Sequence, residues 1–416
     1  MRKALLTAVA VCSLVAASSV AGAQEKLKIG MMATLSGALT SGGEDGVRGV
    51  QVALKQLGNK IAGREVELII ATTDASPDSA LRAARKLVEQ DKVQVIVGPL
   101  SGSEGIAIRD YSKTVPNVTV VDGSSGALET TYVNPSPNYF RFNSNGAMWM
   151  AGLGEYVFKD KGFKKIAVIA EDYSFPYTQV FGFALGYCSA GGQITQRQWV
   201  PLGTKDFGSV IANIPDDVDA VFLGLGGGDA VNFLNQYSQT GGNAKFVGGS
   251  IMVDQTVLSS KGAAKKLLVG TPSSGGVADA WDDPRWKAWV KSYQDAFPPD
   301  KRFASPSLFA TNYYNAFTAL ATGLAKVNAD LSDGGAKLRT ELAKVELDAP
   351  NGKIKLDDDR QAIATTFITE VAELPNGELT NKFVRIVPNV SKTMGLSPEA
   401  FKAVGLPSRT NPECKK

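Results

Sequence analysis

Short apolar runs alternate with amphipathic stretches along the first part of this chain. The runs are rich in β-branched residues and end near glycine, proline or serine, as buried strands do; they cover 28–33, 64–72, 93–97 and 118–121. Between them, apolar residues recur at helical spacing in 44–57 and again after Ser76, which precedes Pro77 as a helix N-cap would. This alternation predicts a parallel sheet with helices on both faces.

The same pattern starts again near residue 143. Further strands are expected at 166–170, 218–223, 246–247, 267–270, 363–371 and 383–387, and further helices at 177–190, 230–239, 283–297 and 308–327. In the helix 283–297, Trp286, Trp289 and Tyr293 have the spacing of a face that packs into the core. The second half of the chain therefore predicts another doubly wound unit of similar size.

The expected fold class is α/β, with two doubly wound parallel-sheet lobes joined by a multi-strand hinge. Because the connecting segments cross between the units more than once, we expect the lobes to close around a cleft. Lobe 1 is expected at 24–142 plus 273–356, and lobe 2 at 143–272 plus 357–416.

Residues 1–23 have the features of a secretory signal peptide. Arg2 and Lys3 give a positive start, residues 4–20 are apolar, and the segment 21–23 offers small residues for cleavage. We therefore expect an exported chain that begins at Gln24 and works in the periplasm.

The charge and the residue composition exclude several classes of function. Without Arg2 and Lys3 the chain has 42 basic and 41 acidic residues, and no basic cluster of the kind that binds nucleic acid is visible. The chain contains no histidine, which excludes Ser-His-Asp and Cys-His nucleophile systems and histidine metal sites. We expect no metal and no cofactor. In an oxidising compartment, Cys188 and Cys414 are expected to form a disulfide that holds the C-terminal tail on a helix; two buried thiols are the alternative.

The stretch 93–110 carries the main candidate site. A buried strand ends at Gly98-Pro99, and Ser101, Gly102 and Ser103 follow just before a helical pattern. A helix that starts at the carboxyl end of a parallel strand presents free backbone N–H groups and its dipole to an anion. We expect these three residues to hold the carboxylate of a small solute; the alternative is that they only cap the helix.

Other strand ends carry similar residues. Ser124 and Ser125, Gly227 within a glycine cluster, and Ser250 would supply hydrogen-bond donors to a cleft shared by two lobes. The aromatic residues Tyr173 and Phe175 also follow a strand and could cover an apolar ligand, or instead pack on the hinge. Glycine and serine are common in any loop of this kind, which is the alternative for the whole set.

Six stretches, in order, resemble one known family: KIGMMATLSGALTSGGEDGVRGVQVAL, VIVGPLSGSEG, VVDGSSGALETT, KIAVIAEDYSFPYTQ, FVGGSIMVDQTVL and LDAPNGKIKLDDDRQA. The chain is similar over nearly all of its mature length to the leucine/isoleucine/valine-binding proteins, the periplasmic substrate-binding components of ABC importers with the type I periplasmic binding fold. The resemblance implies a solute carboxylate at Ser101 to Ser103 and at the turn Asp122 to Ser125, and an aromatic contact from Tyr173 or Phe175.

The resemblance also marks one departure. The family usually supplies an acid for the ligand ammonium, and Ser250 stands at that place here. An ammonium buried without a carboxylate partner is expensive, so Asp122 or Asp254 would have to replace the acid. Similar proteins of this fold take amides, urea or aromatic acids.

The function expected from these observations is a solute receptor without catalytic activity. It binds a small amino acid or a related carboxylate between its lobes, works as a monomer, and presents the closed form to the membrane permease subunits of an ABC importer. Two alternatives remain: a ligand-sensing subunit for a signalling receptor, and an exported α/β hydrolase that uses Asp and Ser residues. The lack of histidine and of the GxSxG and GxxxxGK[ST] motifs counts against the hydrolase.

Overall fold

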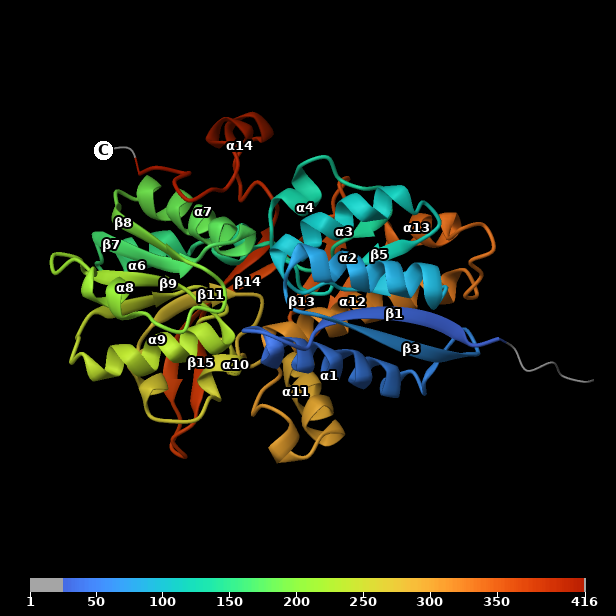
Figure 1. Cartoon of the computed structure of the whole chain (residues 1–416), viewed down its shortest axis with the longest axis horizontal. Coiled ribbons are helices and arrows are strands. Elements are labelled where there is room, and N and C mark those ends of the chain that lie inside the picture. The colour runs from blue at the N-terminus through green and yellow to red at the C-terminus, as the bar shows by residue number, and fades with distance from the viewer. Residues whose placement is uncertain (1–24, 415–416) are drawn as a thin grey trace, which may run out of the picture.

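Two β-sheets flanked by helices lie side by side in this computed structural model, which describes residues 25–414 (Figure 1). The segment 1–23, expected to be a signal peptide, lies outside the described residues. Below, the first lobe means the first sheet with its helices, and the second lobe means the second sheet with its helices.

The first sheet has the strand order β2-β3-β1-β4-β5-β6. Its strands are β1 Leu27–Thr34, β2 Lys60–Ile61, β3 Arg64–Thr73, β4 Val95–Val97, β5 Thr119–Val121 and β6 Tyr139–Phe140. All neighbours pair in parallel except β2 with β3, and the β1–β3 register runs from Leu27 opposite Val66 to Thr34 opposite Thr73. The parallel sheet predicted for this part of the chain is confirmed.

Helices cover both faces of the first sheet, and the last of them come from much later in the chain. Those of the N-terminal part are α1 Thr40–Gln56, α2 Pro77–Arg85, the π-helix η1 Lys86–Gln90, α3 Gly102–Thr114 and α4 Glu129–Tyr132. The later ones are α11 Pro284–Ala296, the 3-10 helix η3 Pro299–Lys301, α12 Leu308–Lys326 and α13 Ala336–Leu342. The long helix α12 packs along α1, which joins segments more than 250 residues apart.

The second sheet has the order β12-β13-β14-β11-β10-β9-β7-β8, with β15 paired to β14. Its strands are β7 Lys165–Glu171, β8 Gln193–Val200, β9 Ala220–Gly224, β10 Lys245–Gly248, β11 Pro272–Gly275, β12 Leu347–Ala349, β13 Gly352–Leu356, β14 Ala362–Glu373 and β15 Leu379–Val390. The helices of this part are α5 Gly146–Trp149, α6 Leu153–Lys159, α7 Ser174–Ser189, α8 Gly208–Ala212, α9 Gly227–Gln239, α10 Gln255–Leu258, the 3-10 helix η2 Ala264–Leu268 and α14 Pro398–Val404. Strands β8, β7, β9, β10 and β11 are parallel, and β14 and β15 add antiparallel pairs.

The lobes are connected at the point where Arg141, just after β6, pairs with Gln361, just before β14. The Arg141 side chain is fully buried, and its guanidinium donates to Gln361 Oε1 at 2.5 Å, to Ala127 O at 2.7 Å and to the Thr131 hydroxyl at 2.6 Å. A buried cation is tolerated only when its donors are satisfied. This hydrogen-bonded arginine therefore fixes the crossing segments to the first lobe.

Most of the predicted elements are present, with shifted ends. The predicted strand 267–270 is wrong: the 3-10 helix η2 ends at Leu268, a turn follows at 269–270, and β11 begins at Pro272. The run is apolar, but among its members only Leu268 is fully buried, and Val269 is 46% exposed. The expected core face of α11 is confirmed, since Trp286, Trp289 and Tyr293 are at most 2% exposed.

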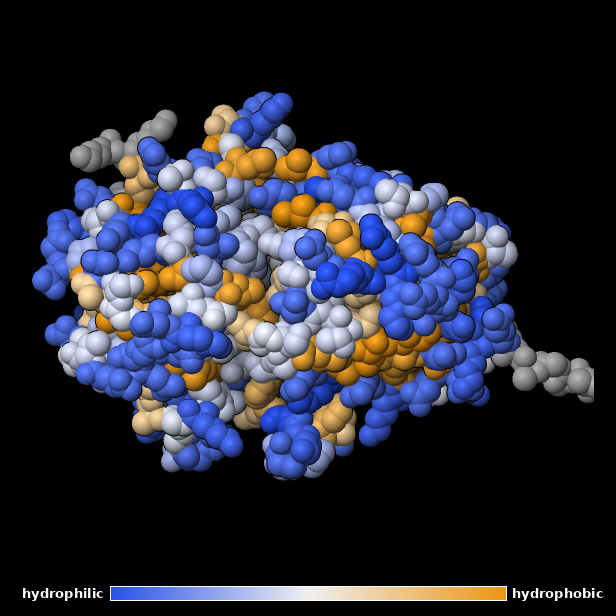
Figure 2. All heavy atoms as spheres, viewed as in Figure 1, coloured by the Kyte–Doolittle hydropathy of each residue, from blue (hydrophilic) through white to orange (hydrophobic). Residues whose placement is uncertain are grey.

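Hydrophilic residues predominate on the face of the molecule seen in Figure 2, and apolar residues form scattered patches among them. Within residues 25–414, no helix combines the length and the apolar character needed to cross a membrane. Over the same range, no group of three acidic or cysteine side chains is arranged to hold a metal ion.

Candidate functional site

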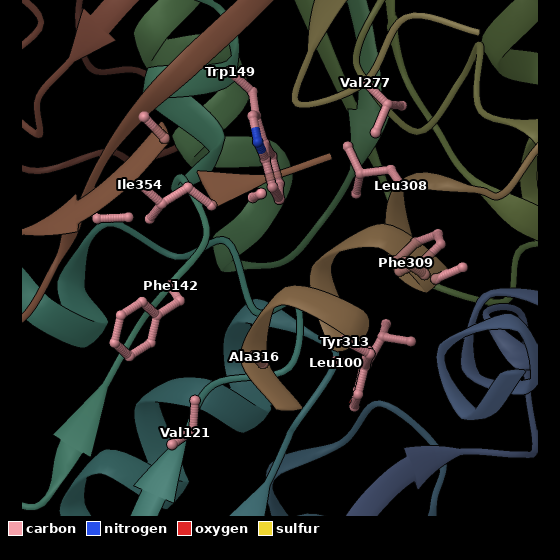
Figure 3. Packing of buried hydrophobic residues seen from close by; sticks show 14 of the residues in the cluster. Leu100, Val121, Phe142, Trp149, Val277, Leu308, Phe309, Tyr313, Ala316 and Ile354 are labelled. Atoms are coloured by element: carbon pink, nitrogen blue, oxygen red, sulfur yellow. The ribbon is translucent and has the colours of Figure 1, made fainter. Parts of the chain in front are cut away.

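A small cavity lies between the two lobes, at the carboxyl ends of their parallel strands. The lobes are closed on each other here, and the volume left to a water-sized sphere is only about 10 Å³. The first lobe contributes Leu39, Leu100, Ser101, Gly102, Ser124, Leu308 and Phe309, and the second lobe contributes Trp149, Tyr173, Phe175 and Ile251. Figure 3 shows Trp149 across from Leu308 and Phe309 at the start of α12.

The turn before α3 leaves backbone amides without intrahelical partners. Ser101 is the N-cap, and it forms a capping box in which its hydroxyl accepts from the Glu104 amide at 3.2 Å while Glu104 Oε2 accepts from the Ser101 amide at 2.9 Å. The first intrahelical bond runs from Gly105 N to Ser101 O. The amides of Gly102 and Ser103 therefore precede the helix ladder and have no intrahelical acceptor. They offer the N–H groups and the helix dipole that attract a carboxylate.

Ser103 itself does not line the cavity but lies at the contact between the lobes. Its hydroxyl is 3.2 Å from the hydroxyl of Ser174, the first residue of α7. Gly102 is beside this contact, because a Cβ at Gly102 would lie 2.9 Å from Ser174 Oγ. The lobes thus meet directly at the rim of the α3 turn.

The two serines after β5 face opposite ways. Ser124 lines the cavity, and its Oγ accepts a hydrogen bond from Asn312 Nδ2 of α12 at 2.9 Å. Ser125 turns inward, where its amide donates to Asp122 Oδ1 at 2.8 Å and its hydroxyl donates to Asp122 Oδ2. Of this pair, the structure places only Ser124 on the cavity.

An aromatic wall closes the cavity on the side of the second lobe. Trp149 and Phe175 pack edge to face with ring centroids 5.8 Å apart, and Tyr173 lies 6.3 Å from Phe175. The close approach of Phe175 to the first lobe depends on Gly126, where a Cβ would lie 2.5 Å from the Phe175 ring. These rings offer a flat apolar surface to a ligand.

Gly227 and Ser250 lie beside the cavity and do not line it. Gly227 begins α9 with φ +47°, and a Cβ there would lie 2.2 Å from Ala38 O of the first lobe. The next amide, Gly228 N, donates to that same carbonyl at 3.0 Å. Ser250 accepts a hydrogen bond from Gln179 Nε2 at 2.6 Å, and its neighbour Ile251 faces the cavity instead.

Neither acid considered for a ligand ammonium reaches the cavity. Asp122 is fully buried and bound to Ser125, Tyr139 and Asn143. Asp254 caps α10 by accepting from Thr256 N at 3.0 Å, and it also accepts from Leu308 N of the first lobe at 2.7 Å. Burial raises the pKa of Asp122, and it raises the pKa of Asp254 to about 6. None of the described residues that line the cavity carries a charge.

Buried carboxyls lie behind the lining on both sides. Burial raises the pKa of Glu104 in the first lobe, and burial together with the neighbouring Asp229 raises the pKa of Glu171 in the second. Glu171 accepts a hydrogen bond from Gly226 N at 2.9 Å. Glu104 thus accepts from the backbone at the start of α3, and Glu171 from the backbone at the start of α9.

Six lining residues were not singled out in the sequence: Leu39, Leu100, Trp149, Ile251, Leu308 and Phe309. A sequence pattern cannot distinguish these apolar side chains from ordinary core residues. Leu308 begins a helix that was predicted to pack within its lobe. The one available signal was position, because Leu39, Leu100 and Ile251 each follow a strand end within a few residues.

The predicted pairing of Cys188 with Cys414 is confirmed. The disulfide joins the last turn of α7 to the C-terminal segment, across 226 residues of sequence.

Two α/β lobes that close on a cavity at their strand ends define the class of bilobed solute-binding proteins. The chain belongs to the periplasmic binding protein family, whose model, described as "Periplasmic binding protein", matches residues 26–378. Membership implies a periplasmic location. The family and fold are those of solute-binding proteins, which bind small molecules, work with permease subunits of ABC transporters and are not enzymes.

The chain is similar to known members over most of its length. Leu/Ile/Val-binding protein homolog 6 of Brucella melitensis is 25% identical over 394 residues, which cover 92% of this chain and 97% of the relative. A solute-binding protein from Rhodopseudomonas palustris in complex with 3,4-dihydroxybenzoic acid has a TM-score of 0.80 at 24% identity, covering 88% of this chain and 98% of its own. A branched-chain amino acid transporter protein from Streptococcus pneumoniae in complex with isoleucine has a TM-score of 0.73 at 19% identity, covering 86% and 99%. These likenesses show the shared fold.

Proposed function

We propose that this protein is the periplasmic solute-binding component of an ABC importer and takes a small monocarboxylate with an apolar, preferably aromatic, body. The observation that carries the proposal is the cavity itself, with free helix amides on one lobe and an aromatic wall on the other. The signal segment is removed on export, and the mature protein acts as a monomer.

The polar end of the ligand is assigned to the α3 turn. Gly102 and Ser124 line the cavity on the first-lobe side, and the amides of Gly102 and Ser103 precede the helix ladder of α3. Because Ser124 Oγ accepts its bond from Asn312, its O–H remains as a donor for the ligand. A carboxylate bound by such donors needs no partner cation, as at other helix N-termini.

The apolar end of the ligand is assigned to the rings of Trp149, Tyr173 and Phe175. With the lobes closed, only about 10 Å³ is open to a water-sized sphere, so the lobes must part to admit a solute, and the short lining favours a small one. The uncharged lining disfavours an α-amino acid, whose ammonium would be buried without a carboxylate. Proteins of the same fold are solved with an aromatic acid, 3,4-dihydroxybenzoic acid, and with an α-amino acid, isoleucine, so both ligand types need to be tested.

The test is calorimetry on the mature chain, freed of bound ligand by unfolding and refolding. The probes are benzoate, 3,4-dihydroxybenzoate, L-leucine, L-isoleucine and benzamide, which matches benzoate in shape but has no charge. We expect stoichiometric binding of an aromatic acid and weaker or no binding of benzamide and of the amino acids. Tight binding of leucine in preference to benzoate would contradict the ligand class, and binding of none of the probes would contradict the proposal.

The variant Ser124→Ala tests the site. It removes one hydrogen bond to the carboxylate, so the affinity for the bound acid should fall by about 1 kcal/mol, roughly fivefold. Ser238→Ala is the matched control, because Ser238 is exposed on α9 and bonds only to Asn235 O of its own helix. An unchanged affinity in Ser124→Ala would remove this hydroxyl from the site.

A further inference from the structure

The C-terminal segment 405–414 runs across the outer edge of the second lobe and is fixed there along its length (Figure 1). Trp199 Nε1 of the edge strand β8 donates to Arg409 O at 3.1 Å, and the guanidinium of Arg197 donates to the same carbonyl at 3.4 Å and to Pro412 O. The disulfide of Cys414 fixes the end of the segment to α7. The backbone at Arg409 is therefore held in place independently of its side chain.

The Arg409 side chain reaches from this segment to the end of β7. Its Nε donates to Asp172 Oδ1 at 2.8 Å, and its Nη2 donates to Asp172 Oδ2, which makes a bidentate pair. The same Nε lies 3.3 Å from the hydroxyl of Tyr177, which itself donates to Asp172 Oδ1. Burial would raise the pKa of Asp172, but the hydrogen bonds from Arg409 and Tyr177 outweigh it and hold that pKa below its usual value.

Asp172 is directly joined to the aromatic wall of the cavity. It precedes Tyr173, which lines the cavity and is the N-cap residue of α7, and Phe175 follows in the first turn. The Tyr173 side chain makes no capping hydrogen bond, in contrast to the capping box of Ser101 at α3. The turn that presents both rings therefore has no side-chain cap at Tyr173, and the Asp172 carboxylate is held both by Tyr177 of α7 and by Arg409 of the C-terminal segment.

We infer that Arg409 is a positioning residue for the ligand site, holding Asp172 so that Tyr173 and Phe175 meet the ligand and Ser174 meets the first lobe. The inference rests on the proposed function, because it assigns Arg409 a role in that same cavity. A ligand bound against these rings loses contact when the turn moves. The contact between Arg409 and Asp172 therefore slows dissociation of the ligand.

The test compares Arg409→Ala and Arg409→Lys with wild type. Arg385→Ala is the matched control, because Arg385 makes an exposed ion pair with Asp160 at 3.1 Å in the same lobe. The first readout is amide hydrogen exchange over residues 172–178 without ligand. We expect Arg409→Ala to exchange there about fivefold faster or more, while exchange in β7 and β9 and the thermal midpoint stay near wild type.

The second readout is the dissociation rate of benzoate measured by stopped flow. We expect it to rise about fivefold or more in Arg409→Ala, the lower end of the coupling range between linked sites. Arg409→Lys should recover part of both effects, since lysine keeps the charge but not the bidentate geometry. Arg385→Ala should change neither.

The two readouts separate the inference from the proposed function. Unchanged exchange at 172–178 in Arg409→Ala overturns the inference, whether or not benzoate binds. Faster exchange with an unchanged benzoate dissociation rate also overturns it, because the turn would then move without consequence for the site. A wild-type protein that binds none of the probes overturns the proposed function, and the exchange comparison still decides whether Arg409 holds the turn.

Discussion

Gly227→Ala is the sharpest perturbation of lobe closure that this structure offers. In the contact between the lobes, a Cβ at Gly227 would lie 2.2 Å from Ala38 O and 3.3 Å from Ala38 C. Carbon and oxygen atoms do not approach so closely, so the first lobe must retreat or the turn must distort. Either change also lengthens or breaks the hydrogen bond from Gly228 N to Ala38 O. Ala38 belongs to the first lobe, so the clash exists only when the lobes are closed.

The magnitude follows from two separate costs. Alanine at φ +47° pays about 1–2 kcal/mol for a left-handed backbone, in the open and the closed form alike. Overpacking against Ala38 costs about 1–3 kcal/mol, and only in the closed form. Because binding requires closure, this second cost appears as a loss of affinity of about 5- to 150-fold.

Gly241→Ala is the matched control. Gly241 has φ +67° in the exposed turn after α9, and a Cβ there would meet nothing within 4 Å. It pays the backbone cost alone, so its thermal midpoint should fall with little change in affinity. The assay is calorimetry with benzoate, together with small-angle scattering to follow closure on ligand addition. Equal affinities in Gly227→Ala and Gly241→Ala would refute the reasoning.

Two further predictions concern stability. Burial raises the pKa of Asp254 to about 6 in the folded state, so the folded chain binds this proton more tightly than the unfolded chain does. The stability from this group is full below the unfolded pKa of about 3.9, and about 3 kcal/mol of it is lost as the pH rises through 6. In urea unfolding, Asp254→Asn should therefore be more destabilising at pH 4 than at pH 7. A difference that does not depend on pH would contradict this. Reduction of the Cys188–Cys414 bond should lower the free energy of unfolding by about 2–5 kcal/mol, and equal urea midpoints with and without reductant would show that the bond does not restrain the unfolded chain.

Part of the candidate site could be predicted from the sequence. Ser101 and Gly102 were found because a strand end followed by small residues and a helix is a local pattern, and the structure places both on the cavity. Tyr173 and Phe175 were found because aromatic residues rarely follow a strand without packing on something. The pairing of Cys188 with Cys414 followed from counting two cysteines in an exported chain.

Other parts could not be read in this way. Ser124 and Ser125 are identical in type and adjacent, and only the hydrogen bonds of Asp122 and Asn312 decide which one faces the cavity. The run at 267–270 has the composition of a strand, but strand formation depends on a neighbouring edge, and there β14 pairs with the segment from Pro272 onward.

The sequence by itself determined most of the strands and helices, the two doubly wound units and the helix start at Ser101, because these depend on local periodicity and on side chains a few residues apart. Only the tertiary structure decided that Trp149, Leu308 and Tyr173 surround one space, since they come from separate elements brought together by lobe packing. The same holds for Arg409, whose contact with Asp172 spans more than two hundred residues and leaves no trace in any local pattern.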